Sequence, residues 1–170
     1  MTNLVSNTGV VATDTSGVGT ARRLLAAAGY GSDKAIFGYG QAAAGSVSMT
    51  NLVSNTGVVA TDTTGVPSAR SALAAAGYGT DKAIFGYGGG GTNLVSNTGV
   101  VAAETSRVGT NRTDLAAAGY GTDKSIFGYG FVSAPASMTN LVSNTGVVAA
   151  DTTGVGTARF SLAAAGYSTT

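Results

Sequence analysis

The sequence predicts an all-β protein of the propeller class, made of four near-identical antiparallel blade repeats of about 42–48 residues, the last repeat one strand short. The first observation is that the segment T-N-L-V-S-N-T-G-V-V-A occurs four times. The second is that each repeat contains short apolar runs separated by turn residues. The third is the period itself, which is typical of a four-stranded blade. The 170-residue chain is interpreted as a single domain with repeats at 2–49, 50–91, 92–138 and 139–170.

Four short strands are expected in each repeat. The aliphatic runs L-V and V-V-A-T give the first two, and the alternating run A-I-F-G-Y gives the fourth. The third run, L-A-A-A-G-Y, has alanines that suit a helix, but Gly29 and Gly31 would stop it within two turns. We therefore expect a strand of small residues that lets neighbouring sheets approach closely. In the first repeat the expected strands lie at 4–5, 10–13, 25–30 and 35–39.

The fourth repeat lacks the D-K-A-I-F-G-Y-G block that begins at Asp33, Asp81 and Asp123. If this block forms the outermost strand of a blade, the last blade simply has three strands. If it forms the second strand, a position inside a blade is unfilled, and another chain has to fill it. Because an unpaired strand edge favours association, the sequence predicts a homo-oligomer or binding to other structural proteins.

The order L-A-A-A-G-Y-G-T-D-K-A-I-F-G-Y-G-G, from Leu73 to Gly89, resembles the kelch repeat. The family pattern also has an upstream arginine, and it occurs here as Arg22, Arg70, Arg112 and Arg159. The family tryptophan is absent, and the paired glycine follows the aromatic strand directly only at Gly88-Gly89. The repeat wording is also similar to repeat proteins of uncultured aquatic bacteriophages. These resemblances imply a kelch-like propeller and a viral protein located in the virion.

Composition excludes many activities. A net charge of +1 without a basic cluster argues against nucleic acid as a partner. The absence of Cys and His excludes disulfides, an ordinary zinc site and a Ser-His-Asp triad. No signal peptide, long apolar stretch or membrane partner is expected. The sequence thus predicts a protein that is not an enzyme and needs no metal or cofactor.

Charged residues recur at fixed repeat positions. An acidic residue stands eight residues before each upstream arginine. One interpretation is a ring of charges around a central tunnel. The favoured one is that each pair is structural and fixes the turn of its own blade through a forked bond. The proposed structural pairs are Asp14–Arg22, Asp62–Arg70, Glu104–Arg112 and Asp151–Arg159.

Aromatic residues are the candidates for ligand or partner contacts. Each of the seven tyrosines stands beside a glycine, and tyrosine among Gly, Ser and Asn is typical of recognition surfaces. The favoured interpretation is packing between blades, with each hydroxyl bonded to a backbone carbonyl. Phe131 interrupts the repeat pattern on a junction of variable length and is a candidate partner contact. The candidate contacts are Tyr39, Tyr87, Tyr129 and Phe131.

Two functions follow from this sequence. The first is a non-enzymatic structural or assembly protein, such as a tail, fibre or capsid-decorating component of a bacteriophage virion. The alternative is a multivalent, lectin-like propeller that binds carbohydrate and gains avidity from its repeats.

Overall fold

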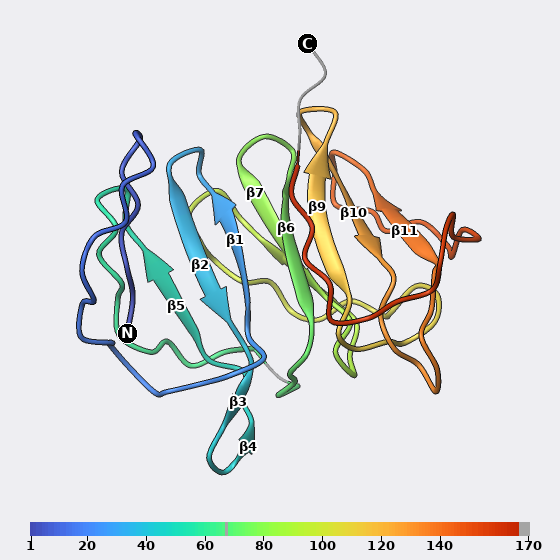
Figure 1. The fold of residues 1–170 in the computed structure, drawn as a ribbon, viewed down its shortest axis with the longest axis horizontal. Helices are drawn as coiled ribbons and strands as arrows, with labels where there is room; N and C mark the ends of the chain where they lie inside the picture. Colours follow the sequence, from blue (N-terminus) through green and yellow to red (C-terminus); the bar gives the residue numbers. More distant parts are fainter. Residues whose placement is uncertain (67, 167–170) are drawn as a thin grey trace.

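The computed structural model describes residues 1–66 and 68–166, and these residues form strands without any helix (Figure 1). The predicted all-β class is confirmed. Three antiparallel sheets repeat the same order of strands. They are β1 (Ala26–Tyr30), β2 (Lys34–Gly38) and β5 (Thr50–Val53); β6 (Ala74–Tyr78), β7 (Lys82–Gly86) and β8 (Thr92–Val95); and β9 (Ala116–Tyr120), β10 (Lys124–Gly128) and β11 (Thr139–Val142).

The L-A-A-A-G-Y segments are strands, as predicted, because a tight turn folds each of them back onto the next strand. Gly31 and Ser32 hold this turn with φ of 59° and 67°, the left-handed region in which glycine is free of strain. The register pairs Tyr30 with Lys34 and Ala26 with Gly38. The other two sheets repeat this turn and this register.

The D-K-[AS]-I-F-G block forms the second strand of each sheet. The sequence left open whether this block is the outermost or the second strand of a sheet, a choice called the strand phase below, and the structure decides it. In the first sheet β2 lies between β1 and β5. A fourth chain segment follows β5 and pairs with it through the bridges Thr50–Thr63 and Val53–Val59. Each sheet therefore combines the end of one sequence repeat with the beginning of the next.

This phase leaves two partial units. The N-terminal hairpin, residues 2–15, repeats the outer bridges as Thr2–Thr15 and Val5–Val11. The C-terminal segment, residues 162–166, has the sequence L-A-A-A-G that also occurs at the first strand of each sheet. An added Cβ at Gly166 would lie 2.8 Å from the backbone oxygen of Gly119 in β9. The fourth repeat consequently forms no sheet of its own among the described residues, in contrast to the expected fourth blade.

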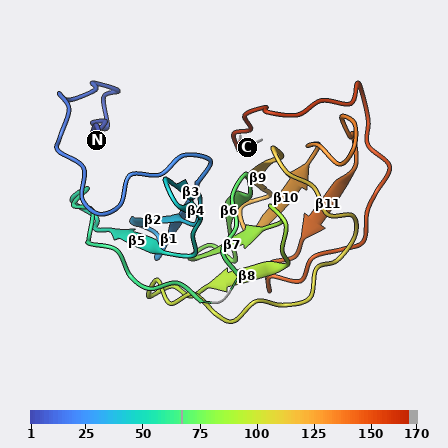
Figure 2. The ribbon, with the colours of Figure 1, turned by 90° about the horizontal axis from the view of Figure 1, so that it is seen from below.

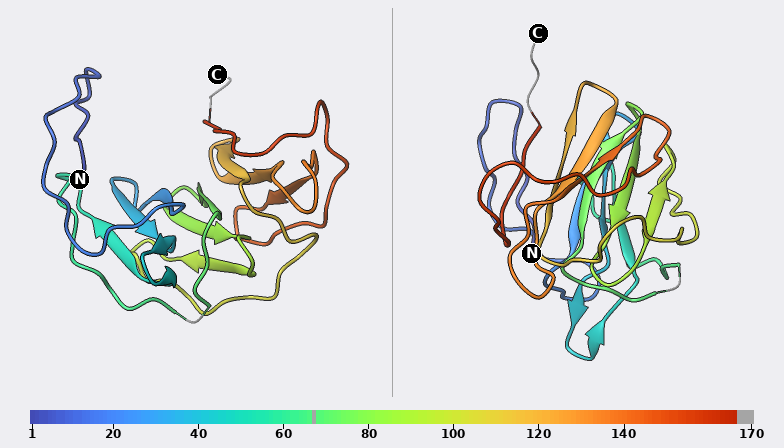
Figure 3. Two further views of the ribbon diagram at one scale, coloured as in Figure 1. Left: turned by 60° about the horizontal axis from the view of Figure 1, so that its bottom comes forward. Right: turned by 90° about the vertical axis from the view of Figure 1, so that its right-hand side faces the viewer.

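The three sheets follow one another along an open arc, with the inner strands β1, β6 and β9 side by side (Figures 2 and 3). The N-terminal hairpin and the C-terminal segment lie at opposite ends of this arc. Glycines allow the close approach that the sequence predicted: a Cβ added at Gly77 would lie 3.6 Å from the Gly29 oxygen. Residues 41–49, which follow the first D-K-A-I-F-G-Y-G block, contain a small hairpin of β3 (Gln41–Ala42) and β4 (Gly45–Ser46).

Aromatic rings fill the core between neighbouring sheets. The ring of Phe85 in β7 covers Gly38 of β2, where an added Cβ would be 2.6 Å from it. The same ring meets Tyr39 edge to face, with centroids 5.2 Å apart. Phe127 repeats this contact on Gly86 and Tyr87, also at 5.2 Å. One packing unit thus recurs wherever one sheet follows another.

Candidate functional site

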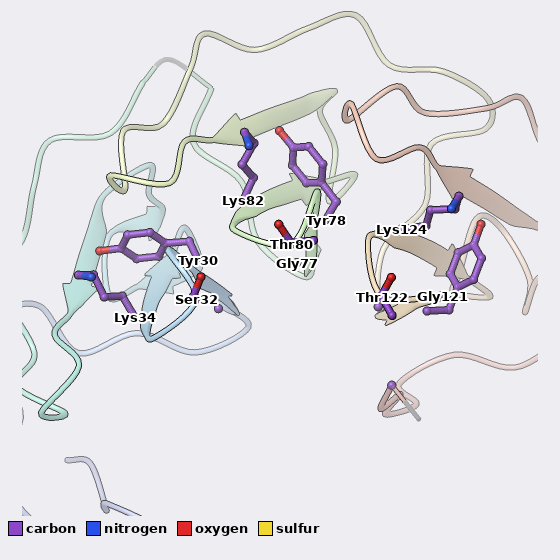
Figure 4. Close-up of a pocket in the computed structure, with 14 residues that line it drawn as sticks. Tyr30, Ser32, Lys34, Gly77, Tyr78, Thr80, Lys82, Gly121, Thr122 and Lys124 are labelled. Atoms are coloured by element: carbon purple, nitrogen blue, oxygen red, sulfur yellow. The ribbon is translucent and has the colours of Figure 1, made fainter. Parts of the chain in front are cut away.

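A groove of 510 Å³ lies where the inner strands turn into the second strands (Figure 4). Its lining repeats three times a tyrosine, a hydroxyl residue and a lysine from the same hairpin. Backbone bonds tie the hairpins together: the Gly31 amide donates to the Asp81 oxygen at 2.7 Å, and the Gly79 amide to the Asp123 oxygen at 2.7 Å. The repeated lining residues are Tyr30, Ser32 and Lys34; Tyr78, Thr80 and Lys82; and Tyr120, Thr122 and Lys124.

Each lysine of the groove is neutralised by the aspartate beside it. Lys34 Nζ lies 2.6 Å from Asp33 Oδ1. This hydrogen bond lowers the pKa of the Asp33 carboxyl and raises that of the Lys34 amine, so both remain charged near neutral pH. The other two hairpins repeat the pair at 2.6 Å and 2.8 Å. The groove therefore offers hydroxyls, amides and balanced charges, which suit a polar ligand without strong net charge.

The groove tyrosines differ in access. Tyr30 and Tyr78 are each 4% exposed, and each packs under the hairpin of the following sheet, at Gly99 and Gly146. Figure 4 shows each of these two rings beside the lysine of its own hairpin. Tyr120, in the last complete sheet, is more open at 37%. Only this third tyrosine presents substantial ring surface to a ligand.

Two of the repeated arginines, Arg70 and Arg112, are buried inside the sheet array, whereas Arg22 is half-buried and Arg159 is exposed. Arg112 donates from Nε to the backbone carbonyl oxygen of Tyr129 at 2.7 Å and from Nη2 to Asn140 Oδ1 at 2.7 Å. Its guanidinium lies 4.4 Å from the centroid of the Tyr87 ring. Asn140 in turn donates to Asp151 Oδ1 at 2.9 Å. This network is structural, since it occupies the space between two sheets.

The predicted charge pairs are wrong. Arg112 lies 3.8 Å from Asp151, and Arg70 lies 3.6 Å from Glu104. Arg22 likewise faces Asp62, whose charge partly offsets the lowering of the Arg22 pKa by burial. The partner comes from the next sequence repeat because each sheet spans two repeats. Asp14 instead accepts from Asn3 at 2.7 Å, and Arg159 stacks on Tyr129 at 3.8 Å.

The acidic partners are held in their charged form. Partial burial raises the pKa of the Asp151 carboxyl, but hydrogen bonds from Thr110 and Asn140 outweigh it. The pKa of Asp151 is therefore lowered. Folded-state stability from this carboxylate is present above its ordinary value of 3.8 and is lost as the pH falls through the folded-state pKa.

Two predicted contact residues are corrected by their burial. Tyr39 and Tyr87 are 0% exposed, because each is enclosed by a phenylalanine and an arginine of the next sheet. They are not available to a ligand. The packing interpretation is supported at Tyr87 and Tyr129, whose hydroxyls donate to the Val108 and Val155 oxygens at 3.2 and 2.9 Å.

Tyr129 and Phe131 differ from the buried pair. Both side chains are half-buried. Phe131 meets Phe160 edge to face at a centroid distance of 5.2 Å. They lie near the C-terminal end of the arc, and their role as partner contacts stays a prediction.

The ends of the arc expose side chains that are buried elsewhere, a feature the sequence alone does not reveal. Val5 in the N-terminal hairpin is 64% exposed, whereas its equivalents Val95 and Val142 are 0% exposed and Val53 in the first sheet is half-buried. Phe37 is half-buried, whereas Phe85 and Phe127 are fully buried. A cavity of 460 Å³ beside Phe37 is also lined by Arg22 and Leu25. This exposure could have been predicted only by knowing which segments of the sequence combine into one sheet.

No protein-family model and no curated protein matches the chain. Within residues 1–66 and 68–166, acidic side chains form no group of three that could hold a metal ion. The same part of the chain contains no helix with the length and apolar character needed to cross a membrane.

Proposed function

We propose that the protein is a non-enzymatic structural or assembly protein of the kelch-like propeller class that forms homo-oligomers through the two ends of its sheet array. The observation that carries this proposal is the exposure of Val5, at a position that is fully buried as Val95 and Val142 in the second and third sheets. Apolar side chains and unpaired strand edges exposed together favour association. The similarity of the repeat to bacteriophage proteins leads us to propose a virion component as its setting.

Radial repetition supports the propeller assignment. Strands β1, β6 and β9 are adjacent, and equivalent glycine–phenylalanine contacts join consecutive sheets. Continuing this relation beyond β9 would place the C-terminal segment of one copy and the N-terminal hairpin of the next in one mixed sheet. Such a sheet would have its inner strand from one chain and its outer hairpin from the other, and the second-strand position between them would still be open.

Two substitutions in the N-terminal hairpin test this proposal with a matched control. Val5→Lys places a charge at a position that is fully buried in the second and third sheets, and we expect it to weaken self-association at least tenfold. Val10→Lys changes a residue that is 65% exposed, as are its equivalents Val58, Val100 and Val147 at 65–66%, and we expect no change. Sedimentation velocity measures the self-association constant of each variant.

Equal effects of the two lysines on self-association would contradict assembly through the N-terminal hairpin. Because both valines are largely exposed in the single chain, neither change is expected to unfold it. Near-identical thermal unfolding of the two variants is the control for this premise.

A second candidate function is carbohydrate binding in the groove between the hairpins. The observation that favours it is the threefold recurrence of a hydroxyl residue and a lysine around 510 Å³. Individual sites of this kind would be weak, and repetition would supply avidity. We expect binding on a glycan array to fall when Thr80→Ala and Thr122→Ala are combined. Binding that survives both changes, or the absence of any bound glycan, would remove this candidate.

A further inference from the structure

We propose that the C-terminal segment, together with Gly128 and Tyr129, accepts an extended segment of sequence [Ala/Ser]-Ile-Phe-Gly-Tyr-Gly as an added β-strand. The inference rests on the proposed assembly function and names the chemistry of the partner. Its physical basis is that the same chain shows, in its complete sheets, what normally occupies this position.

The first part of the site is an unpaired strand edge. In all three sheets the L-A-A-A-G-Y strand pairs along its length with the following K-[AS]-I-F-G strand. The C-terminal segment has the same sequence and lies beside β9, yet none of the described residues pairs with it as a second strand. Its alanines are exposed, whereas Ala74 and Ala76 of β6 are each 6% exposed. Adding a strand to such an edge is a recognised mode of peptide binding.

The second part is an uncovered space beside Gly128, here called the seat, that a phenylalanine ring fits. Gly38 and Gly86 are each covered by the phenylalanine of the following sheet, 2.6 Å from an added Cβ. At the equivalent Gly128, the nearest described atom to an added Cβ is Thr139 Cγ2, at 3.6 Å. A phenylalanine on the incoming strand would fill this seat in the way that Phe127 fills the seat at Gly86.

The third part is the ring of Tyr129, which has no aromatic partner among the described residues. Tyr39 and Tyr87 each have one ring partner, a phenylalanine at 5.2 Å, and one cationic partner at 4.4 Å. Tyr129 already has its cation, since Arg159 lies 3.8 Å from the ring centroid. Within the described chain its aromatic partner is lacking, so half of the enclosing shell is in place.

The residues directly before the C-terminal segment are anchored by the same backbone bonds as in the complete sheets. The Gly130 amide donates to the Arg159 oxygen at 3.0 Å, as the Gly88 amide donates to the Arg112 oxygen at 3.1 Å. The Ser161 amide donates to the Asp114 oxygen at 2.8 Å, as the Asp114 amide donates to the Ala72 oxygen at 2.9 Å. A pre-organised edge loses less conformational entropy on binding.

These three features define the incoming segment. A small first residue matches Ala35, Ala83 and Ser125 at the equivalent position of the second strands. The phenylalanine fills the seat at Gly128. A glycine after it permits a further unit to approach as closely as Phe85 approaches Gly38.

The test uses the full chain and a fluorescein-labelled peptide of sequence D-K-A-I-F-G-Y-G, which corresponds to residues 81–88. Fluorescence anisotropy is expected to show saturable binding with a dissociation constant below about 1 mM. A peptide carrying Phe85→Ala should bind about tenfold more weakly or worse, because the buried ring is lost. Both peptides are also titrated with the Val5→Lys chain, in which self-association is expected to be weaker.

A substitution in the chain tests the seat directly. Gly128→Val fills the space at a position without positive φ and with no contact closer than 3.6 Å, and it should abolish binding of the unmodified peptide. Ser46→Val, on the exposed β4 strand, is the matched control and should bind it normally. Absence of saturable binding up to about 1 mM, or equal binding of the two peptides, would overturn the inference.

The outcomes separate this inference from the assembly proposal. A chain that self-associates but does not bind the peptide contradicts the inference and leaves assembly through the ends in place. A chain that binds the peptide but stays a single copy at all concentrations supports strand addition and contradicts homo-oligomer formation.

Discussion

Replacing Arg112 with alanine is expected to lower the free energy of unfolding by about 3 kcal/mol. Arg112 is 1% exposed, and it joins Asn140, Asp151 and the Tyr129 backbone between two sheets. Its removal leaves a buried amide oxygen without its donor and takes the cation from the Tyr87 ring. The Asp151 side chain retains 28% exposure, so water partly compensates it and the loss stays at the lower end for a buried pair. Urea unfolding measures this loss.

Arg23→Ala is the matched control for Arg112. Arg23 is exposed, and its Nε donates to Gln41 at 2.9 Å. Its removal should change the free energy of unfolding by no more than about 0.5 kcal/mol. Similar losses for the two alanine variants would contradict a structural role for the buried arginine network.

Adding one methyl group at Gly86 is expected to lower the free energy of unfolding by about 1–3 kcal/mol. The new Cβ would lie 2.6 Å from the Phe127 ring, which is fully buried against Tyr87 and has no free space to move into. Gly128→Ala makes the same chemical change at the equivalent position of the last sheet. The nearest atom there is 3.6 Å away, so this variant should unfold within about 0.5 kcal/mol of the parent.

The difference between these two glycine variants is the informative quantity in urea unfolding. Equal destabilisation would mean that Gly128 is covered like its equivalents, and both the open end of the arc and the seat for a phenylalanine ring would be wrong. A harmless Gly86→Ala would contradict the packing between consecutive sheets.

The first two strands of each sheet and the turn between them could be predicted from the sequence because they depend on local features. The V-V-A-T runs, expected as strands, form only isolated bridges such as Val53–Val59. Alternating apolar residues and the paired turn residues at Gly31 and Ser32 are sufficient to indicate β1 and β2. The alanine run was a harder case, and Gly29 correctly argued against a helix. The close approach of inner strands at small residues also followed from composition.

The phase of the sheets could not be predicted because it depends on long-range pairing. A period fixes the length of a unit, but any point of a repeat can be its boundary. Placing the boundary at Thr50 led to the pairing of Asp62 with Arg70, whereas the sheet pairs Arg70 with Glu104. The same uncertainty hid the exposure of Val5 and of the C-terminal segment, since both depend on which strands complete a sheet.

The burial of Tyr39 and Tyr87 was equally outside the reach of the sequence. A tyrosine between two glycines has the same local pattern on a binding surface as in a core. The decision is made by Phe85 and Arg70 at Tyr39, which come from the following sheet. The groove was not predicted, because the convergence of its lining residues depends on three hairpins lying side by side.

Light scattering of the purified chain over a wide range of concentrations tests the central claim most directly. Assembly through the ends of the arc predicts a mass that is a stable multiple of 16.5 kDa, and a return toward the single-chain mass in the Val5→Lys variant. A mass of 16.5 kDa at every concentration would contradict assembly of identical chains.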